Sequence, residues 1–265
     1  MTGTTSQQPF AWQDAPTTLP AMIAFDLDDT LAPSKTALSD EMAELLVELL
    51  RHVDVCIISG GQIEQFRMQV VNRLPEDAEA FTRLHLMPTC GTQYWRFDDG
   101  AWVQRYATNL TDQQITDAFE IIERTARELG YWESDTWGPI LENRGSQVTF
   151  SALGQEAPVD EKKKWDPTGS KKEALRAAIA PQLPDLEVRS GGSTSIDVTL
   201  QGVDKAYGMR QLERETGIAF EKTIFVGDRL DEGGNDYPVL VLPLTGVKVD
   251  GPDETAAYLR VLLAD

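Results

Sequence analysis

Two aspartates stand at the end of a short apolar run, and their spacing allows both carboxylates to act at one reaction site. Asp26 and Asp28 close the run that begins at Ala21, and one residue separates them. Residues two apart in an extended chain point to the same side, so both carboxylates are predicted to face one site. Two carboxylates repel each other when they are removed from water, and a cation between them relieves that repulsion. The pair therefore indicates a metal-assisted reaction.

Polar residues also close two later apolar runs. Ser59 follows residues 55–58, and Asp228 follows residues 223–226 after Gly227. The carboxyl ends of parallel strands line one crevice, so these side chains are predicted to meet. Carboxylates are the hard ligands that Mg²⁺ prefers, and the acid of a Gly-Gly-Asn-Asp segment can orient its waters. The predicted cofactor is Mg²⁺, and the predicted metal-binding residues are Asp26, Asp28, Asp228 and Asp236.

These residue types fit phosphoryl transfer. Asp26 would attack phosphorus and form an aspartyl-phosphate, which splits one hard displacement into two easier ones. Asp28 would act as general acid and then as general base. Ser59 can donate a hydrogen bond to a phosphoryl oxygen, and Lys205, which opens a helix, can neutralise charge on the same group.

The elements around these residues predict an α/β protein with an insertion. Apolar runs alternate with amphipathic helical segments from residue 21 to about 93, and the pattern returns at Ser195–Leu200 and continues to the C-terminus. This is typical of a doubly wound parallel sheet. Between the two parts, helices mix with strands of alternating character, which predicts an inserted α+β domain. The predicted bounds are 1–20 for a disordered tail, 21–93 with 192–265 for the core, and 94–191 for the inserted cap.

Composition narrows the function further. The chain has 265 residues, 41% of them apolar, and a formal net charge of −19, which argues against a nucleic-acid or anionic-membrane surface. No apolar run is long enough for a signal peptide or a membrane span. Two cysteines without metal-ligand spacing indicate free thiols in a reducing cytoplasm, so we expect a cytoplasmic protein. A calcium-loop interpretation of the Asp26 segment fails because Leu31 and Ala37 stand where Gly and Glu are required.

The order of these motifs resembles a known superfamily. The segment DLDDT at Asp26–Thr30, Ser59, Lys205 and the stretch GDRLDEGGND at Gly227–Asp236 are similar to the haloacid dehalogenase superfamily, with an insertion where its type IIB cap lies. Further motifs resemble the eukaryotic-type phosphomannomutases. They are SGG at Ser59–Gly61, ENR at Glu142–Arg144, GGSTSIDV at Gly191–Val198, VDK at Val203–Lys205 and GGNDYPV at Gly233–Val239.

This resemblance implies a Rossmann-like core, Mg²⁺, an aspartyl-phosphate and a cap that closes over a phosphorylated sugar. It also implies a homodimer through the cap. The residues that it implies for substrate binding are Thr30, Gly60, Arg144, Ser195 and Asp197. Three positions depart from the family's pattern. Asp29 replaces a glycine, and Trp137 and Gln155 replace two of the arginines that hold the phosphate that does not react.

Three functions stay open. The lost arginines weaken a mutase, which must hold a sugar bisphosphate in two orientations, more than they weaken a hydrolase. We therefore expect a sugar-phosphate phosphatase first and a phosphohexomutase second. A binding module without catalysis is the third, and it has no need of Asp28 as a proton shuttle beside an intact nucleophile.

Overall fold

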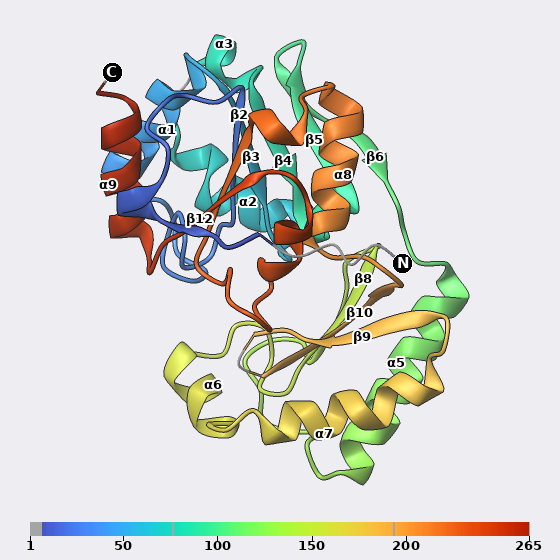
Figure 1. Ribbon diagram of the computed structural model, residues 1–265. Helices are drawn as coiled ribbons and strands as arrows, with labels where there is room; N and C mark the ends of the chain where they lie inside the picture. Colours follow the sequence, from blue (N-terminus) through green and yellow to red (C-terminus); the bar gives the residue numbers. More distant parts are fainter. Residues whose placement is uncertain (1–6, 76, 193, 265) are drawn as a thin grey trace. The chain divides into compact units, whose positions relative to one another are not determined.

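The computed structural model describes residues 7–75, 77–192 and 194–264 (Figure 1). The chain divides into two compact units. We call residues 1–107 with 204–265 the core unit, and residues 108–203 the inserted unit. Both ends of the chain thus contribute to one unit, and the other is a single continuous segment. Within the described residues, no helix combines the length and the apolar character that crossing a membrane requires.

The core unit is built on a mixed sheet of eight strands. Their spatial order is β1-β12-β11-β2-β3-β4-β5-β6, with parallel pairing from β1 to β4 and antiparallel pairing beyond. The strands are β1 (Phe10–Ala11), β2 (Met22–Phe25), β3 (Asp54–Ile58), β4 (Leu84–Met87), β5 (Gln93–Asp98), β6 (Ala101–Ala107), β11 (Thr223–Gly227) and β12 (Thr245–Lys248). The predicted parallel α/β core is confirmed.

Helices cover both faces of this sheet. They are α1 (Asp40–Leu50), α2 (Ile63–Gln69), α3 (Ala78–Phe81), α4 (Pro88–Gly91), α8 (Lys205–Thr216) and α9 (Pro252–Leu262). Alternate residues of β2 enter different clusters: Ile23 and Phe25 pack with α1, α2 and α9, whereas Met22 and Ala24 pack with α8. Figure 1 shows α1 and α9 on one side of the strands and α8 on the other. A strand buried on both faces reads as an unbroken apolar run, which is why β2 could be found in the sequence.

The inserted unit is an antiparallel sheet with helices on it. The strands β7 (Leu141–Asn143), β8 (Gln147–Ser151), β9 (Leu186–Ser190) and β10 (Ser195–Leu200) lie in the order β7-β8-β10-β9. Its helices are α5 (Asp112–Glu128), α6 (Val159–Trp165) and α7 (Ser170–Ile179). Residues of α5 and α7 share one hydrophobic cluster with the strands. The α5 helix begins with a capping box formed by Thr111 and Gln114.

The bounds of this unit differ from the predicted ones at both ends. It begins at Thr108 rather than 94 and ends at Val203 rather than 191. At the first end, β5 pairs antiparallel with β4, which extends the core sheet with the β5–β6 hairpin. At the second end, Ser195–Leu200 was predicted to resume the core, but as β10 it pairs with β8 and β9 of the inserted sheet. Periodicity identifies a strand and not its pairing partners, so the assignment to the core was wrong.

The predicted disordered tail, residues 1–20, also needs correction. Residues 1–6 lie outside the described residues. Phe10 and Ala11 form β1, which pairs parallel with β12, and Ala15 is buried in the core. The hydroxyl of Tyr258 in α9 donates a hydrogen bond to the Pro16 carbonyl at 2.8 Å. The open edge of β12 and these contacts order a segment whose composition is polar.

Candidate active site

Three polar residues follow three neighbouring strands of the core sheet. Asp26 follows β2, Ser59 follows β3, and Asp228 follows β11; β2 lies between the other two. The Asp26 amide donates to the Val226 carbonyl at 3.0 Å, so the β2–β11 ladder extends to the first carboxylate. The arrangement at the carboxyl ends of parallel strands is the one expected from the sequence.

Lys205 joins two buried carboxylates. Its Nζ lies 2.5 Å from Asp26 Oδ1 and 2.5 Å from Asp236 Oδ1, and all three side chains are buried. Lys205 is the first residue of α8, which is capped by the Asp204 side chain accepting from the Tyr207 amide at 2.8 Å. The cap fixes where the helix begins and therefore where the lysine stands.

Burial and charge shift the pKa values in opposite senses. Burial raises the pKa of the Asp26 carboxyl well above its usual range, and the ammonium of Lys205 opposes that shift. Burial alone would lower the pKa of Lys205, but the carboxylates of Asp236 and Asp26 raise it above its ordinary value. Lys205 is therefore a fixed positive charge at working pH.

The same carboxylates form a group that fits a cation. One oxygen from each of Asp26, Asp228 and Asp236 lies within 4.8 Å of the others. Burial, followed by the negative charge of Asp236, raises the pKa of Asp228. With every group ionised, three negative charges face the single positive charge of Lys205, which leaves an excess of two. An all-oxygen donor set with this excess suits a hard divalent cation.

Neighbouring groups hold these ligands in place. Thr30 Oγ1 donates to Asp228 Oδ1 at 3.3 Å and accepts from the Asp228 amide at 3.1 Å. Asp236 Oδ2 accepts from the Arg229 amide at 3.1 Å. A Cβ on Gly227 would lie 2.5 Å from Asp236 Oδ2, so glycine is required there for the two segments to approach. Thr30 thus supports Asp228, a contact that the residue types alone did not indicate.

The carboxylate of Asp28 is not among the three that meet, so its predicted role as a metal ligand stays a prediction. Its oxygens accept from the Lys35 amide at 2.7 Å, from Gln65 Nε2 at 3.0 Å and from Gln69 Nε2 at 3.3 Å. The prediction assumed an extended chain, but the backbone leaves β2 before Asp26 and turns at Asp29. The turn directs Asp28 toward α2 rather than toward Asp228.

Asp29 occupies a left-handed backbone conformation, with φ of 61°. Glycine adopts this conformation most readily, and aspartate is among the few other residues that tolerate it. Asp29 Oδ1 also accepts from the Ser34 amide at 3.0 Å, which stabilises the turn. The replacement of the family's glycine therefore keeps the loop geometry.

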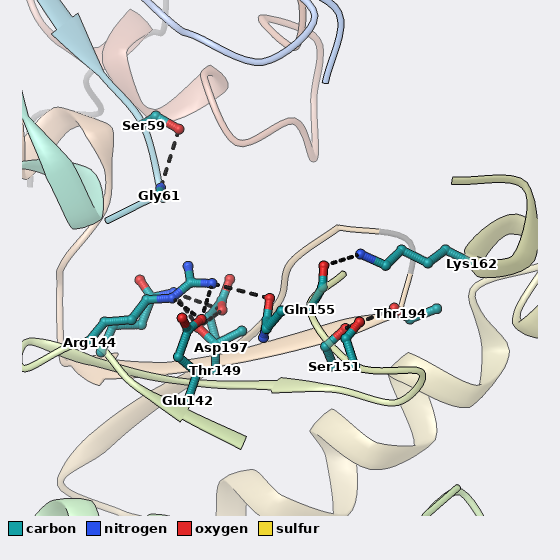
Figure 2. Close-up of polar contacts among 12 residues, drawn as sticks. Ser59, Gly61, Glu142, Arg144, Thr149, Ser151, Gln155, Lys162, Thr194 and Asp197 are labelled. Carbon is teal, nitrogen blue, oxygen red and sulfur yellow. Dashed lines mark hydrogen bonds and ion pairs between the residues drawn. The ribbon is translucent and has the colours of Figure 1, made fainter. Parts of the chain in front are cut away.

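Ser59 and Gly60 form the loop after β3. Ser59 is buried, and its Oγ accepts from the Gly61 amide at 3.3 Å, as Figure 2 shows. A Cβ on Gly60 would meet nothing within 4 Å, so packing does not require glycine at that position.

In the inserted unit, Arg144 lies in a polar cluster (Figure 2). Its Nε and Nη2 donate to Glu142 Oε2 at 2.8 and 2.7 Å, and Nη2 also donates to Gln155 Oε1 at 3.4 Å. Asp197 accepts at one oxygen, Oδ1, from Thr149 and Gln147, each at 2.8 Å. Burial raises the pKa of Asp197, and the charge of Arg144 opposes this most. Arg144 and Asp197 were both predicted, and Glu142 is the partner that sequence reasoning missed.

Ser195 begins β10, two residues before Asp197. Its amide donates to the Gly192 carbonyl at 3.4 Å, and its carbonyl accepts from the Gly191 amide at 2.9 Å. A Cβ on Gly191 would lie 2.6 Å from Asp197 Oδ2, so the glycine turn packs against that carboxylate. Ser195 is therefore linked by backbone hydrogen bonds to the glycine turn that packs against Asp197.

Comparisons of the sequence with known proteins indicate one family. The family model described as "Eukaryotic phosphomannomutase" matches residues 42–265. The phosphomannomutase of Saccharomyces cerevisiae is 27% identical over 261 residues, which cover 96% of this chain and 97% of the relative.

Solved structures at lower identity show the fold. An IMP-nucleotidase of Plasmodium falciparum matches with a TM-score of 0.66 at 14% identity, covering 96% of this chain and 70% of that one. A haloacid dehalogenase-like hydrolase from Bacteroides thetaiotaomicron matches with a TM-score of 0.60 at 15% identity, covering 91% and 98%. The fold is similar to that of a haloacid dehalogenase-like hydrolase, and the chain belongs to the eukaryotic phosphomannomutase family.

Proposed function

We propose that the protein is a Mg²⁺-dependent phosphotransferase that acts on a phosphorylated sugar through an aspartyl-phosphate at Asp26. The observation that carries the proposal is the buried group in which Lys205 joins Asp26 to Asp236 beside Asp228. A nucleophilic carboxylate held by a fixed ammonium at a strand end is what phosphoryl transfer requires. Membership of the phosphomannomutase family supports the sugar phosphate as substrate.

Asp26, Asp228 and Asp236 would hold the cation. When bound, Mg²⁺ would neutralise charge on the phosphoryl oxygens and offset the carboxylates' own repulsion. Lys205 would keep the Asp26 carboxylate ionised and oriented, and Ser59 would donate a hydrogen bond to a phosphoryl oxygen.

The reaction would proceed in two displacements. In the first, an oxygen of Asp26 attacks phosphorus, the bond from phosphorus to the sugar oxygen breaks, and that oxygen takes a proton from Asp28. In the second, Asp28 removes a proton from the acceptor hydroxyl, whose oxygen attacks phosphorus. The bond to Asp26 then breaks, and the carboxylate is restored.

The acceptor decides the overall activity. A sugar hydroxyl as acceptor gives a phosphohexomutase, and the family membership favours this outcome. Water as acceptor gives a phosphatase, and the surroundings of Arg144 favour it as a second candidate. Arg144 is bound by Glu142 and faces the neutral amide of Gln155. In this cluster Arg144 would bind the second phosphate of a sugar bisphosphate more weakly than it would beside further arginines.

One assay separates these outcomes. The protein is incubated with mannose 1-phosphate or glucose 1-phosphate, with and without a hexose 1,6-bisphosphate, and both free phosphate and sugar phosphates are measured. Formation of the 6-phosphate without free phosphate supports the mutase, whereas release of phosphate supports the hydrolase. Neither product across a panel of phosphorylated sugars would contradict the proposed function.

A further inference from the structure

Two glutamine side chains of α2 reach the carboxylate of Asp28. Gln65 Nε2 lies 3.0 Å from Asp28 Oδ2, and Gln69 Nε2 lies 3.3 Å from Oδ1. Residues four apart on a helix lie on one face, so a single helical turn supplies both amides. We propose that Gln65 and Gln69 are positioning residues that orient Asp28 for proton transfer; this inference rests on the proposed function.

The amide of Gln69 is fixed in one orientation. Gln69 is only 3% exposed, and its Nε2 also donates to the Thr36 carbonyl at 2.5 Å. Turning the amide would place its oxygen against that carbonyl and against the Asp28 carboxylate, which removes two hydrogen bonds and creates two repulsive contacts. Gln69 therefore presents N–H groups to Asp28, and its position also holds the loop at Thr36.

The contact of Gln65 depends on a glycine beside it. A Cβ on Gly61 would lie 2.1 Å from Gln65 Oε1, so any larger residue would displace the amide. Gly61 is in the loop that follows Ser59, and its amide donates to the Ser59 hydroxyl. The loop predicted to bind phosphate and the residue that orients Asp28 are thus packed against each other.

The two carboxylate oxygens of Asp28 differ in their hydrogen bonds. Oδ1 accepts from the Lys35 amide at 2.7 Å as well as from Gln69, which fills its two acceptor positions. Among the residues that the structure describes, Oδ2 accepts from Gln65 alone and keeps one position for another group. The geometry makes Oδ1 the anchored oxygen and Oδ2 the oxygen that exchanges the proton, with Gln65 setting its direction.

The test compares leaving groups. Gln65→Glu puts a carboxylate in place of the amide that contacts Asp28 Oδ2, while Met68→Glu adds the same charge at a position of α2 that is 65% exposed. A sugar oxygen needs a proton to leave, whereas p-nitrophenolate does not. We expect Gln65→Glu to slow formation of the aspartyl-phosphate from the sugar phosphate about tenfold and from p-nitrophenyl phosphate less than about threefold. Met68→Glu should leave both rates unchanged.

The results separate this inference from the proposed function. Equal slowing with both substrates, or no slowing, would overturn the positioning role while the function stands. A wild-type protein that forms no aspartyl-phosphate from either substrate would overturn both. Thermal melts establish that the variants are folded, and Gln65→Leu, which removes the donor without adding charge, carries the same comparison if Gln65→Glu does not fold.

Discussion

Lys205 is the residue whose replacement should affect both stability and chemistry. Its ammonium lies 2.5 Å from Asp26 and from Asp236, and its side chain is 1% exposed. Lys205→Met keeps the length of the side chain and removes the charge, so two buried carboxylates lose their partner. Breaking a buried ion pair in this way costs about 3–5 kcal/mol. At about 2–4 °C per kcal/mol for a chain of this size, the melting temperature should fall by about 6–20 °C.

The activity should fall further than the stability suggests. Removing one group that stabilises charge in the transition state lowers kcat about 10²–10³-fold. We expect at least a hundredfold loss for Lys205→Met. A double variant with Asp236→Asn should recover part of the stability, because one of the two unpaired charges is then absent, and none of the activity.

The assay is a thermal melt by circular dichroism, without added metal, beside steady-state turnover at saturating Mg²⁺. Lys248→Met is the matched control, since Lys248 is 39% exposed and lies 3.4 Å from Asp231. An exposed pair of this kind contributes less than about 1 kcal/mol. A Lys205→Met protein that melts with the control and retains turnover would refute the reasoning.

Three further predictions concern the metal, the core and pH. Adding Mg²⁺ should raise the melting temperature of the wild type and not of Asp228→Asn; equal shifts in both would contradict the metal site. Gly208→Ala should lower the free energy of unfolding by about 1–3 kcal/mol, because its Cβ would lie 2.6 Å from the Cys90 carbonyl oxygen; denaturation in urea measures this, and unchanged stability would show that the helix can shift. Burial lowers the pKa of His85, whose ring bonds to Asp54 at 2.8 Å. The unfolded imidazole therefore binds protons first, and stability should fall as pH drops below about 6.5, with a smaller slope in His85→Gln.

The sequence predicted the core well because buried parallel strands have a recognisable composition. Residues 22–25 are buried without exception, so β2 appears as an apolar run closed by Asp26. The same reasoning placed Ser59 and Asp228 at the ends of the adjacent strands. These predictions succeeded because each polar residue comes directly after its strand in the sequence, so locating the strand also locates the residue.

The errors share a physical cause, which is that pairing and turns depend on residues far away. Residues 195–200 show the same alternation whichever sheet they join, and their pairing with β8 and β9 is decided by packing in the inserted unit. Asp28 lies two residues after Asp26, but the left-handed turn at Asp29 sends it to α2. The i, i+4 spacing of Gln65 and Gln69 was visible, yet nothing in the residue types linked that helix face to Asp28.

The central claim is that the transferred phosphoryl group resides on Asp26. It is tested most directly by mixing the protein with a hexose phosphate and Mg²⁺, quenching within the first turnover, and reducing with borohydride, which converts an acyl phosphate on aspartate to homoserine. Peptide mass spectrometry should find homoserine at position 26 in the wild type and none in Asp26→Asn. Homoserine at another aspartate, or full turnover by Asp26→Asn, would contradict the account.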